Sequence, residues 1–128
     1  MYTVLVADDS GVVRSVVKRA LLDLGIESID EANNGRDAIE FIANNSYDLI
    51  VTDWNMPEYT GLDVVRAARA AGQHCPIIMQ TTVSDRGNVM LAIQAGVNDY
   101  VLKPFSKEEI SEKMEQYVGV CKTASANS

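Results

Sequence analysis

Hydrophobic residues form five short runs along the chain, most of them rich in β-branched side chains. Runs of this kind predict strands that are buried on both faces, as in a parallel sheet. We place these strands at residues 3–7, 28–32, 47–52, 76–82 and 100–102. The second run has Ile29 as its only large apolar residue, which predicts an edge strand. Gln80 is unusual in a strand expected to be buried on both faces.

Between these runs, apolar residues recur every three or four positions, the spacing of an amphipathic helix. Capping residues mark where the helices begin. We expect helices after Ser10, Asn34, Thr60, Ser84 or Asp85, and Ser106. Glycines are placed to end three of them, at Gly25, Gly72 and Gly96.

Strands that alternate with helices predict an α/β fold, with a doubly wound five-stranded parallel sheet covered by five helices. This is the flavodoxin-like arrangement. We assign residues 1–121 to one domain and predict that the small, polar residues 122–128 form a disordered tail. Arg66 and Arg69 lie about one turn apart on the third helix, and we expect both on a solvated face.

Composition narrows the classes of partner. The 128 residues include 11 basic and 18 acidic side chains, a formal net charge of -7, which argues against nucleic acid or an anionic membrane as the main partner. No apolar run reaches membrane-spanning length and no leader precedes Thr3, so we expect a soluble, cytoplasmic protein. Cys75 and Cys121 lack metal or redox spacing; two free thiols are favoured, and a disulfide stays open.

Polar side chains gather where four of the five strands end. They are Asp8, Asp9, Asp53, Thr81, Thr82 and Lys103. Because the carboxyl ends of parallel strands lie at one edge of a sheet, these side chains should converge there. Asp53 alone could equally be a turn residue, but its companions favour a functional site.

Three clustered carboxylates repel one another, at a cost of about 4 kcal/mol per close pair for an effective dielectric near 20. A hard divalent cation removes this cost, and oxygen ligands suit Mg²⁺. A carboxylate nucleophile, Asp53, beside Mg²⁺ and the ammonium of Lys103 is suited to phosphoryl transfer that yields an aspartyl phosphate.

The ordered set of motifs resembles the receiver domain of two-component response regulators. The resemblance rests on Asp8-Asp9, Asp53-Trp54-Asn55-Met56-Pro57, Gly61-Leu62, Thr81, Gln94-Ala95-Gly96, Tyr100 and Lys103-Pro104-Phe105. It covers residues 2–118, and the stretch from Asp53 to Pro57 is particularly similar to the CheY-like chemotaxis members. The resemblance implies the CheY-like form of the flavodoxin-like fold.

The resemblance also implies roles for individual residues. Asp53 would accept a phosphoryl group from a histidine kinase or a small phosphodonor. Asp9, Asp53 and the main-chain carbonyl of Asn55 would bind Mg²⁺ directly, and Asp8 mainly through water. Thr81 and Lys103 would bind the phosphoryl oxygens, and the Lys103–Pro104 peptide would be cis.

Three residues near the site are expected to set access and reaction rates, namely Asn55, Thr82 and Val83. Thr82 stands where relatives commonly carry a small residue, so its bulk would narrow the approach to the phosphoryl group. Val83 stands where many relatives carry an acidic or polar residue, and a valine cannot orient water.

The fourth helix contains five consecutive apolar residues, 89–93, which is more than one buried stripe requires. Either neighbouring elements cover the helix, or part of it is a partner surface. The resemblance implies an output face formed by the fourth helix, fifth strand and fifth helix, with Val89, Ile93 and Tyr100 on it. Phosphorylation would shift Thr81 toward the phosphoryl group and turn Tyr100 inward.

The leading hypothesis is a stand-alone, monomeric response regulator. A CheA-like histidine kinase would phosphorylate it, the flagellar motor switch would bind it, and a phosphatase is a possible further partner. It would be no enzyme beyond catalysing its own phosphorylation and dephosphorylation. Alternatives are a phosphate sink or relay, and a receiver fragment of a longer regulator, although Met1 favours a complete protein.

Two other protein classes fit less well. Phosphatases of the haloacid dehalogenase family carry Asp-x-Asp on the first strand, whereas this chain has adjacent Asp8 and Asp9. A flavodoxin-type flavin carrier needs a Ser/Thr- and Gly-rich phosphate loop after the first strand, where the two aspartates would repel phosphate.

Overall fold

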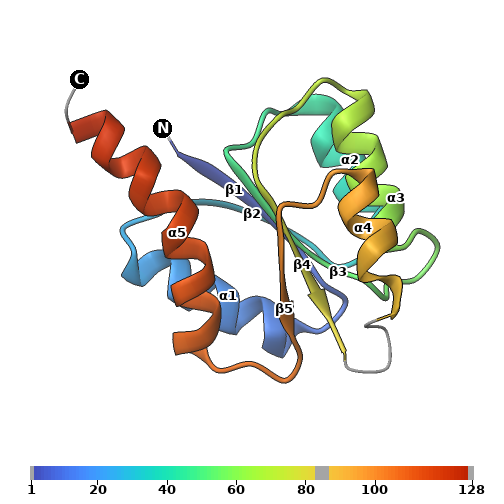
Figure 1. Ribbon diagram of the computed structural model, residues 1–128, viewed down its shortest axis with the longest axis horizontal. Coiled ribbons are helices and arrows are strands. Elements are labelled where there is room, and N and C mark those ends of the chain that lie inside the picture. The colour runs from blue at the N-terminus through green and yellow to red at the C-terminus, as the bar shows by residue number, and fades with distance from the viewer. Residues whose placement is uncertain (1, 83–86, 127–128) are drawn as a thin grey trace.

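The computed structural model describes residues 2–82 and 87–126, with side chains up to residue 118 (Figure 1). The strands are β1 (Thr3–Ala7), β2 (Ser28–Ala32), β3 (Leu49–Asp53), β4 (Ile77–Thr81) and β5 (Asp99–Leu102). The helices are α1 (Gly11–Asp23), α2 (Gly35–Asn44), α3 (Gly61–Ala70), α4 (Val89–Ala95) and α5 (Lys107–Ala126). The predicted alternation of strands and helices is confirmed.

The five strands form one parallel sheet in the order β2-β1-β3-β4-β5, so β2 is the edge strand that its composition predicts. Helices α1 and α5 pack together on one face, and α2, α3 and α4 cover the other (Figure 1). This is the predicted doubly wound arrangement, and it places the carboxyl ends of all five strands at one edge.

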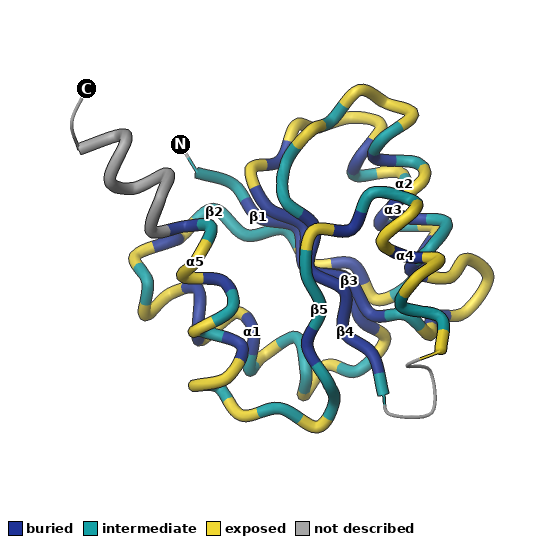
Figure 2. The backbone as a smooth tube through the Cα atoms, in the orientation of Figure 1, coloured by how far each residue is buried: buried dark blue, intermediate teal, exposed yellow. Residues whose placement is uncertain are grey.

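Two hydrophobic clusters occupy the two faces of the sheet. Val6, Val51 and Ile78 pack under α1 and α5, whereas Leu5, Ile50 and Met79 pack under α2 and α3. Every residue of β3 and β4 is buried, which agrees with their reading as two-face buried strands (Figure 2).

The predicted caps are formed. Ser10 and Asn34 accept hydrogen bonds from the backbone N–H groups of Val13 (3.3 Å) and Asp37 (2.7 Å), and Thr60 makes a reciprocal capping box with Asp63. Gly25, Gly72 and Gly96 follow their helices with φ of 87°, 81° and 118°. The expected helix start at Ser84 or Asp85 lies outside the described residues.

Helix α5 ends at Ala126, beyond the predicted domain boundary at residue 121. The structure corrects one expectation. Arg69 is not on a solvated face, because its guanidinium donates to backbone carbonyls in the segment before β4 and in the segment after α4. Arg66 is exposed, as expected. Within the described residues, no helix is long and apolar enough to span a membrane.

Candidate phosphoacceptor and metal site

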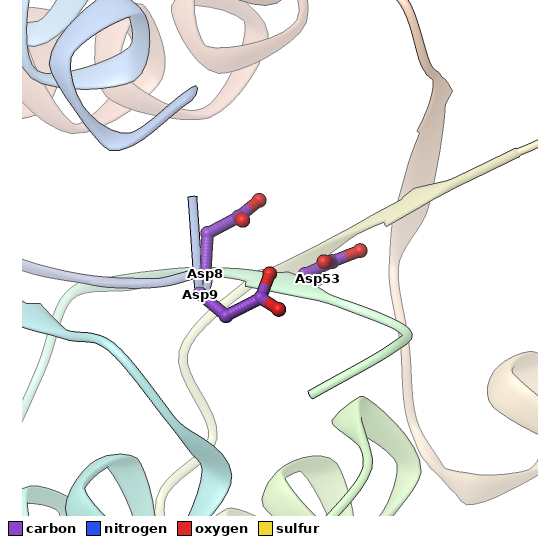
Figure 3. A group of neighbouring side chains, drawn as sticks. All are labelled: Asp8, Asp9 and Asp53. Atoms are coloured by element: carbon purple, nitrogen blue, oxygen red, sulfur yellow. The ribbon is translucent and has the colours of Figure 1, made fainter. Parts of the chain in front are cut away.

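Three carboxylates converge where β1 and β3 leave the sheet. Asp8 and Asp9 follow β1 and Asp53 ends β3, and one oxygen of each lies within 4.8 Å of the others. Figure 3 shows the carboxylate of Asp9 directed toward Asp53, with Asp8 beside them. Asp8 and Asp53 are 0% and 6% exposed, whereas Asp9 is exposed. The predicted convergence of these residues is confirmed.

Lys103 joins this cluster from β5. Its ammonium lies 2.8 Å from Asp8 Oδ2 and 3.1 Å from Asp53 Oδ2. Burial by itself lowers the pKa of Lys103, but the hydrogen bond to Asp8 and the negative charges of Asp53 and Asp8 outweigh burial and raise the pKa. Lys103 is therefore a fixed positive charge at the end of the site that lies toward β5.

One backbone donor and one side-chain donor hold Asp8 in place. The backbone N–H of Ser10 donates to Asp8 Oδ1 at 2.8 Å, and the guanidinium of Arg14 donates to the Asp8 carbonyl oxygen at 2.6 Å. Arg14 lies one turn into α1, so the start of that helix is tied to the end of β1. The regular helical spacing of Arg14 carries no signal for this contact, so the sequence does not predict it.

The environment of Asp53 disfavours its ionised form. Burial, and then the negative charge of Asp8, raise the pKa of the Asp53 carboxyl; Lys103 and the backbone N–H of Asn55 offset part of this rise. Gly61, at the start of α3, packs directly on the backbone of Asp53. A Cβ at this position would collide with the Asp53 carbonyl oxygen. The Gly61-Leu62 motif marks this position, but the motif by itself does not predict the contact of Gly61 with the Asp53 backbone.

The carboxylates fit a hard divalent cation. Asp8 and Asp53 are buried close together, and Lys103 is the one cation that contacts both of them among the described residues. All the candidate metal ligands are carboxylate oxygens, the ligand type that Mg²⁺ prefers. Asp8, Asp9 and Asp53 would hold the ion, and Asn55, the fourth expected ligand, is an exposed residue two positions after Asp53.

The hydroxyl residues lie at the end of β4. Thr81 is buried, and its hydroxyl donates to the carbonyl oxygen of Thr82 at 3.4 Å. Thr82 lines an apolar groove of about 340 Å³ together with Lys103, Phe105 and residues of α1. Val83, another of the three expected access residues, lies outside the described residues. The Lys103–Pro104 peptide is cis, as the resemblance implies.

Helix α4 presents much of its apolar run to solvent. Met90, Leu91 and Ile93 are 63%, 48% and 50% exposed, whereas Ala92 is buried. Val89 and Tyr100 are partly buried, and Tyr100 also lines a cleft of about 430 Å³ between β5 and α5. The reading in which neighbouring elements cover the whole run is therefore wrong for these three residues.

Comparison with known proteins adds independent findings. Residues 4–115 match the family described as response regulator receiver domain. The chain is 41% identical to the chemotaxis protein CheY of Pseudomonas aeruginosa, over 88% of this chain and 93% of that protein. It is 43% identical to CheY1 of Helicobacter pylori strain J99, over 90% and 95%.

Solved structures agree. The chemotaxis response regulator CheY4 of Vibrio cholerae superposes with a TM-score of 0.83 at 31% identity, over 91% of this chain and 98% of that chain. The receiver domain of a sensor histidine kinase from P. aeruginosa, solved with magnesium in its active-site cleft, has a TM-score of 0.79 at 29% identity, over 92% and 98%.

Proposed function

Because this chain belongs to the response regulator receiver domain family, we propose that it accepts a phosphoryl group on Asp53 and signals in bacterial chemotaxis. The observation that carries the proposal is the cluster itself: a buried carboxylate, two further carboxylates within 4.8 Å, and a lysine 3.1 Å away.

The residues divide the chemistry among them. A carboxylate oxygen of Asp53 attacks phosphorus in line. The bond that breaks joins phosphorus to the nitrogen of a phosphohistidine or of phosphoramidate, or to the acyl oxygen of acetyl phosphate. Lys103 stabilises the negative charge on the phosphoryl oxygens, and Thr81 turns from the Thr82 carbonyl to donate to one of them. Mg²⁺, held by Asp8, Asp9, Asp53 and the Asn55 carbonyl, would neutralise the remaining charge. Water later cleaves the acyl phosphate and releases inorganic phosphate.

The protein thus catalyses only its own phosphorylation and dephosphorylation, and is no enzyme with a separate substrate. Asn55, Thr82 and Val83 set the access of donors and water, and hence the two rates.

The exposed apolar residues of α4 support an output surface. Met90, Leu91 and Ile93 face solvent, and Tyr100 lines a cleft between β5 and α5. Movement of Thr81 toward the phosphoryl group, with Tyr100 turning inward, would change this surface, on which Val89 and Ile93 also lie. Phosphorylation would then shift an existing two-state equilibrium.

The similarity to chemotaxis proteins supports particular partners. A CheA-like histidine kinase would be the donor and the flagellar motor switch the target, with a phosphatase as a further partner. The protein would act as a cytoplasmic monomer, without nucleic acid or membrane contacts. A phosphate sink or relay, or a receiver within a longer regulator, uses the same chemistry with another output.

The test is phosphorylation by a small donor. We expect acetyl phosphate or phosphoramidate with Mg²⁺ to add one phosphoryl group in intact-mass spectra, and expect no adduct with chelator or in Asp53→Asn. An adduct that persists in Asp53→Asn would contradict the assignment of the acceptor. Steady hydrolysis of an added phosphomonoester would instead support the aspartate-nucleophile phosphatase.

A further inference from the structure

Gln80 is a buried polar side chain that the proposed chemistry leaves unused. It is 0% exposed in β4, and within residues 2–82 and 87–118 neither its Nε2 nor its Oε1 has a hydrogen-bond partner. Buried amides in folded proteins nearly always have partners, so a solitary one calls for an explanation. An apolar residue would fill this strand position at lower cost.

The sheet register places Gln80 beside the site. Its Cα pairs with Asp53 on β3 and with Val101 on β5, and its carbonyl oxygen accepts from the Trp54 backbone N–H at 3.0 Å. Because side chains alternate along a strand, Gln80 lies on the same face as Ile78, under α1 and α5. By the same alternation Lys103, two residues after Val101, belongs to this face.

Metal binding would leave the Lys103 ammonium in need of another hydrogen-bond acceptor. In this structure its ammonium, which carries three donors, contacts the carboxylates of Asp8 and Asp53. Both carboxylates belong to the cluster that a divalent cation would engage. The cation would compete with the ammonium for carboxylate oxygens and would repel its positive charge, so the ammonium would gain from an acceptor outside the carboxylate cluster.

We propose that Gln80 is a positioning residue for Lys103, and that its Oε1 accepts a hydrogen bond from the ammonium when a cation takes the carboxylates. The inference rests on the proposed function, since it concerns the same metal and phosphoryl site. Gln80 would keep Lys103 ordered beside Asp53, where the phosphoryl group arrives, rather than releasing it to solvent.

The test measures Mg²⁺ affinity through the fluorescence of Trp54, the single tryptophan of the chain, which is half-buried next to Asp53. Gln80→Met keeps a similar volume and removes both polar atoms. We expect it to weaken Mg²⁺ binding about tenfold, the usual effect of one hydrogen bond to a charged group. Ile78→Val, on the same strand and face, is the matched control and should leave the affinity unchanged.

A double-mutant cycle separates positioning from packing. Lys103→Ala removes the competing ammonium and should by itself tighten Mg²⁺ binding. In that background, Gln80→Met should have no further effect on the affinity. An equal effect in both backgrounds, or none in wild-type Lys103, would overturn the inference, and Gln80→Leu repeats the measurement if the methionine variant folds poorly.

The same samples distinguish the two proposals. If the wild-type protein forms the phosphoryl adduct but Gln80→Met binds Mg²⁺ normally, the role of Gln80 is wrong and the proposed function stands. If the wild-type protein shows neither Mg²⁺ binding nor adduct, both proposals are wrong.

Discussion

Tyr47 joins the start of β3 to the edge strand through one short hydrogen bond. Its hydroxyl donates to Asp30 Oδ2 at 2.7 Å, and its ring is buried among residues of the α2 and α3 face. Burial first, and then the bond to Asp30 and the charge of Asp30, raise the pKa of Tyr47 above its usual value. A single residue thus makes stability depend on pH far from the functional site.

We expect Tyr47→Phe to lower the free energy of unfolding by about 1–2 kcal/mol at pH 7, because the bond to a charged acceptor is lost. The raised pKa means that folded Tyr47 keeps its proton where the unfolded chain has lost it. Its contribution is therefore fully present below about pH 10 and is lost as pH rises further. In urea unfolding from pH 7 to 11, the difference in unfolding free energy between wild type and Tyr47→Phe should shrink as pH rises. Tyr59→Phe, at an exposed tyrosine, should show no such pH-dependent difference from wild type.

At the scale of elements, the packing of helices on strand ends keeps the site in shape. The start of α3 rests on the end of β3: the Gly61 N–H donates to the Trp54 carbonyl oxygen at 2.9 Å, and an added Cβ would meet both the Asp53 backbone and Met79 Sδ. A helix thus sets the position of the phosphoacceptor through backbone contact rather than through side-chain chemistry.

Gly61→Ala should displace the Asp53 backbone. We expect a loss of about 2–3 kcal/mol in the free energy of unfolding, typical of overpacking, and about a hundredfold slower phosphorylation by acetyl phosphate. Gly87→Ala is the control, because an added Cβ there meets nothing within 4 Å. Normal phosphorylation of folded Gly61→Ala would show that the contact does not position Asp53.

Arg69 links three elements through one guanidinium. It donates to the carbonyl oxygens of Gln73 (2.9 Å) and Cys75 (2.8 Å) before β4, and to that of Gly96 (2.6 Å) after α4. Its Nη2 also donates to Asn98 Oδ1 at 3.0 Å. The end of α3 is thereby fastened to the segments that lead into β4 and β5.

We expect Arg69→Ala to lower the free energy of unfolding by about 2–4 kcal/mol, because several backbone acceptors lose a charged donor. Arg66→Ala, one turn earlier on the same helix and exposed, should change it by less than about 0.5 kcal/mol. Chemical denaturation of both variants at pH 7 measures the difference. Equal losses of unfolding free energy would mean that helix propensity, and not the guanidinium hydrogen bonds, determines the effect.

At the scale of the whole molecule, the acidic cluster couples metal binding to folding. Asp8, Asp9 and Asp53 come from strand ends that meet only in the folded sheet, so the unfolded chain has no comparable site. A ligand that binds only the folded state stabilises the whole protein in proportion to the logarithm of its concentration.

Mg²⁺ at one hundred times its dissociation constant should therefore raise the free energy of unfolding by about 2.7 kcal/mol, and chelation should reverse the gain. Asp9→Asn should be at least as stable as wild type without metal, because it relieves repulsion within the carboxylate cluster, but it should gain much less from Mg²⁺. Glu115→Gln, an exposed acid on α5, should gain as much as wild type. Thermal scans with and without Mg²⁺ test this; an equal gain in Asp9→Asn would place the ion elsewhere.

Much of this protein follows from local sequence. The apolar runs determine the strands because two-sided burial requires them, the caps Ser10, Asn34 and Thr60 determine where helices begin, and the motif order indicates the family. Even the convergence of Asp8, Asp53 and Lys103 could be predicted, because parallel strands share one edge. The extension of α5 to Ala126 could not be predicted, because the small and polar residues at its end are equally compatible with a helix and with coil.

Tertiary structure decided what depends on contacts between distant segments. The partners of Arg69, the approach of Gly61 to the Asp53 backbone and the solitary amide of Gln80 follow from how helices and strands pack, and no local pattern encodes them. The raised pKa of Asp53 likewise needs its burial and the proximity of Asp8, from another strand. The sequence therefore determined which residues could act, and the packing determined their charge states and the contacts that hold them in place.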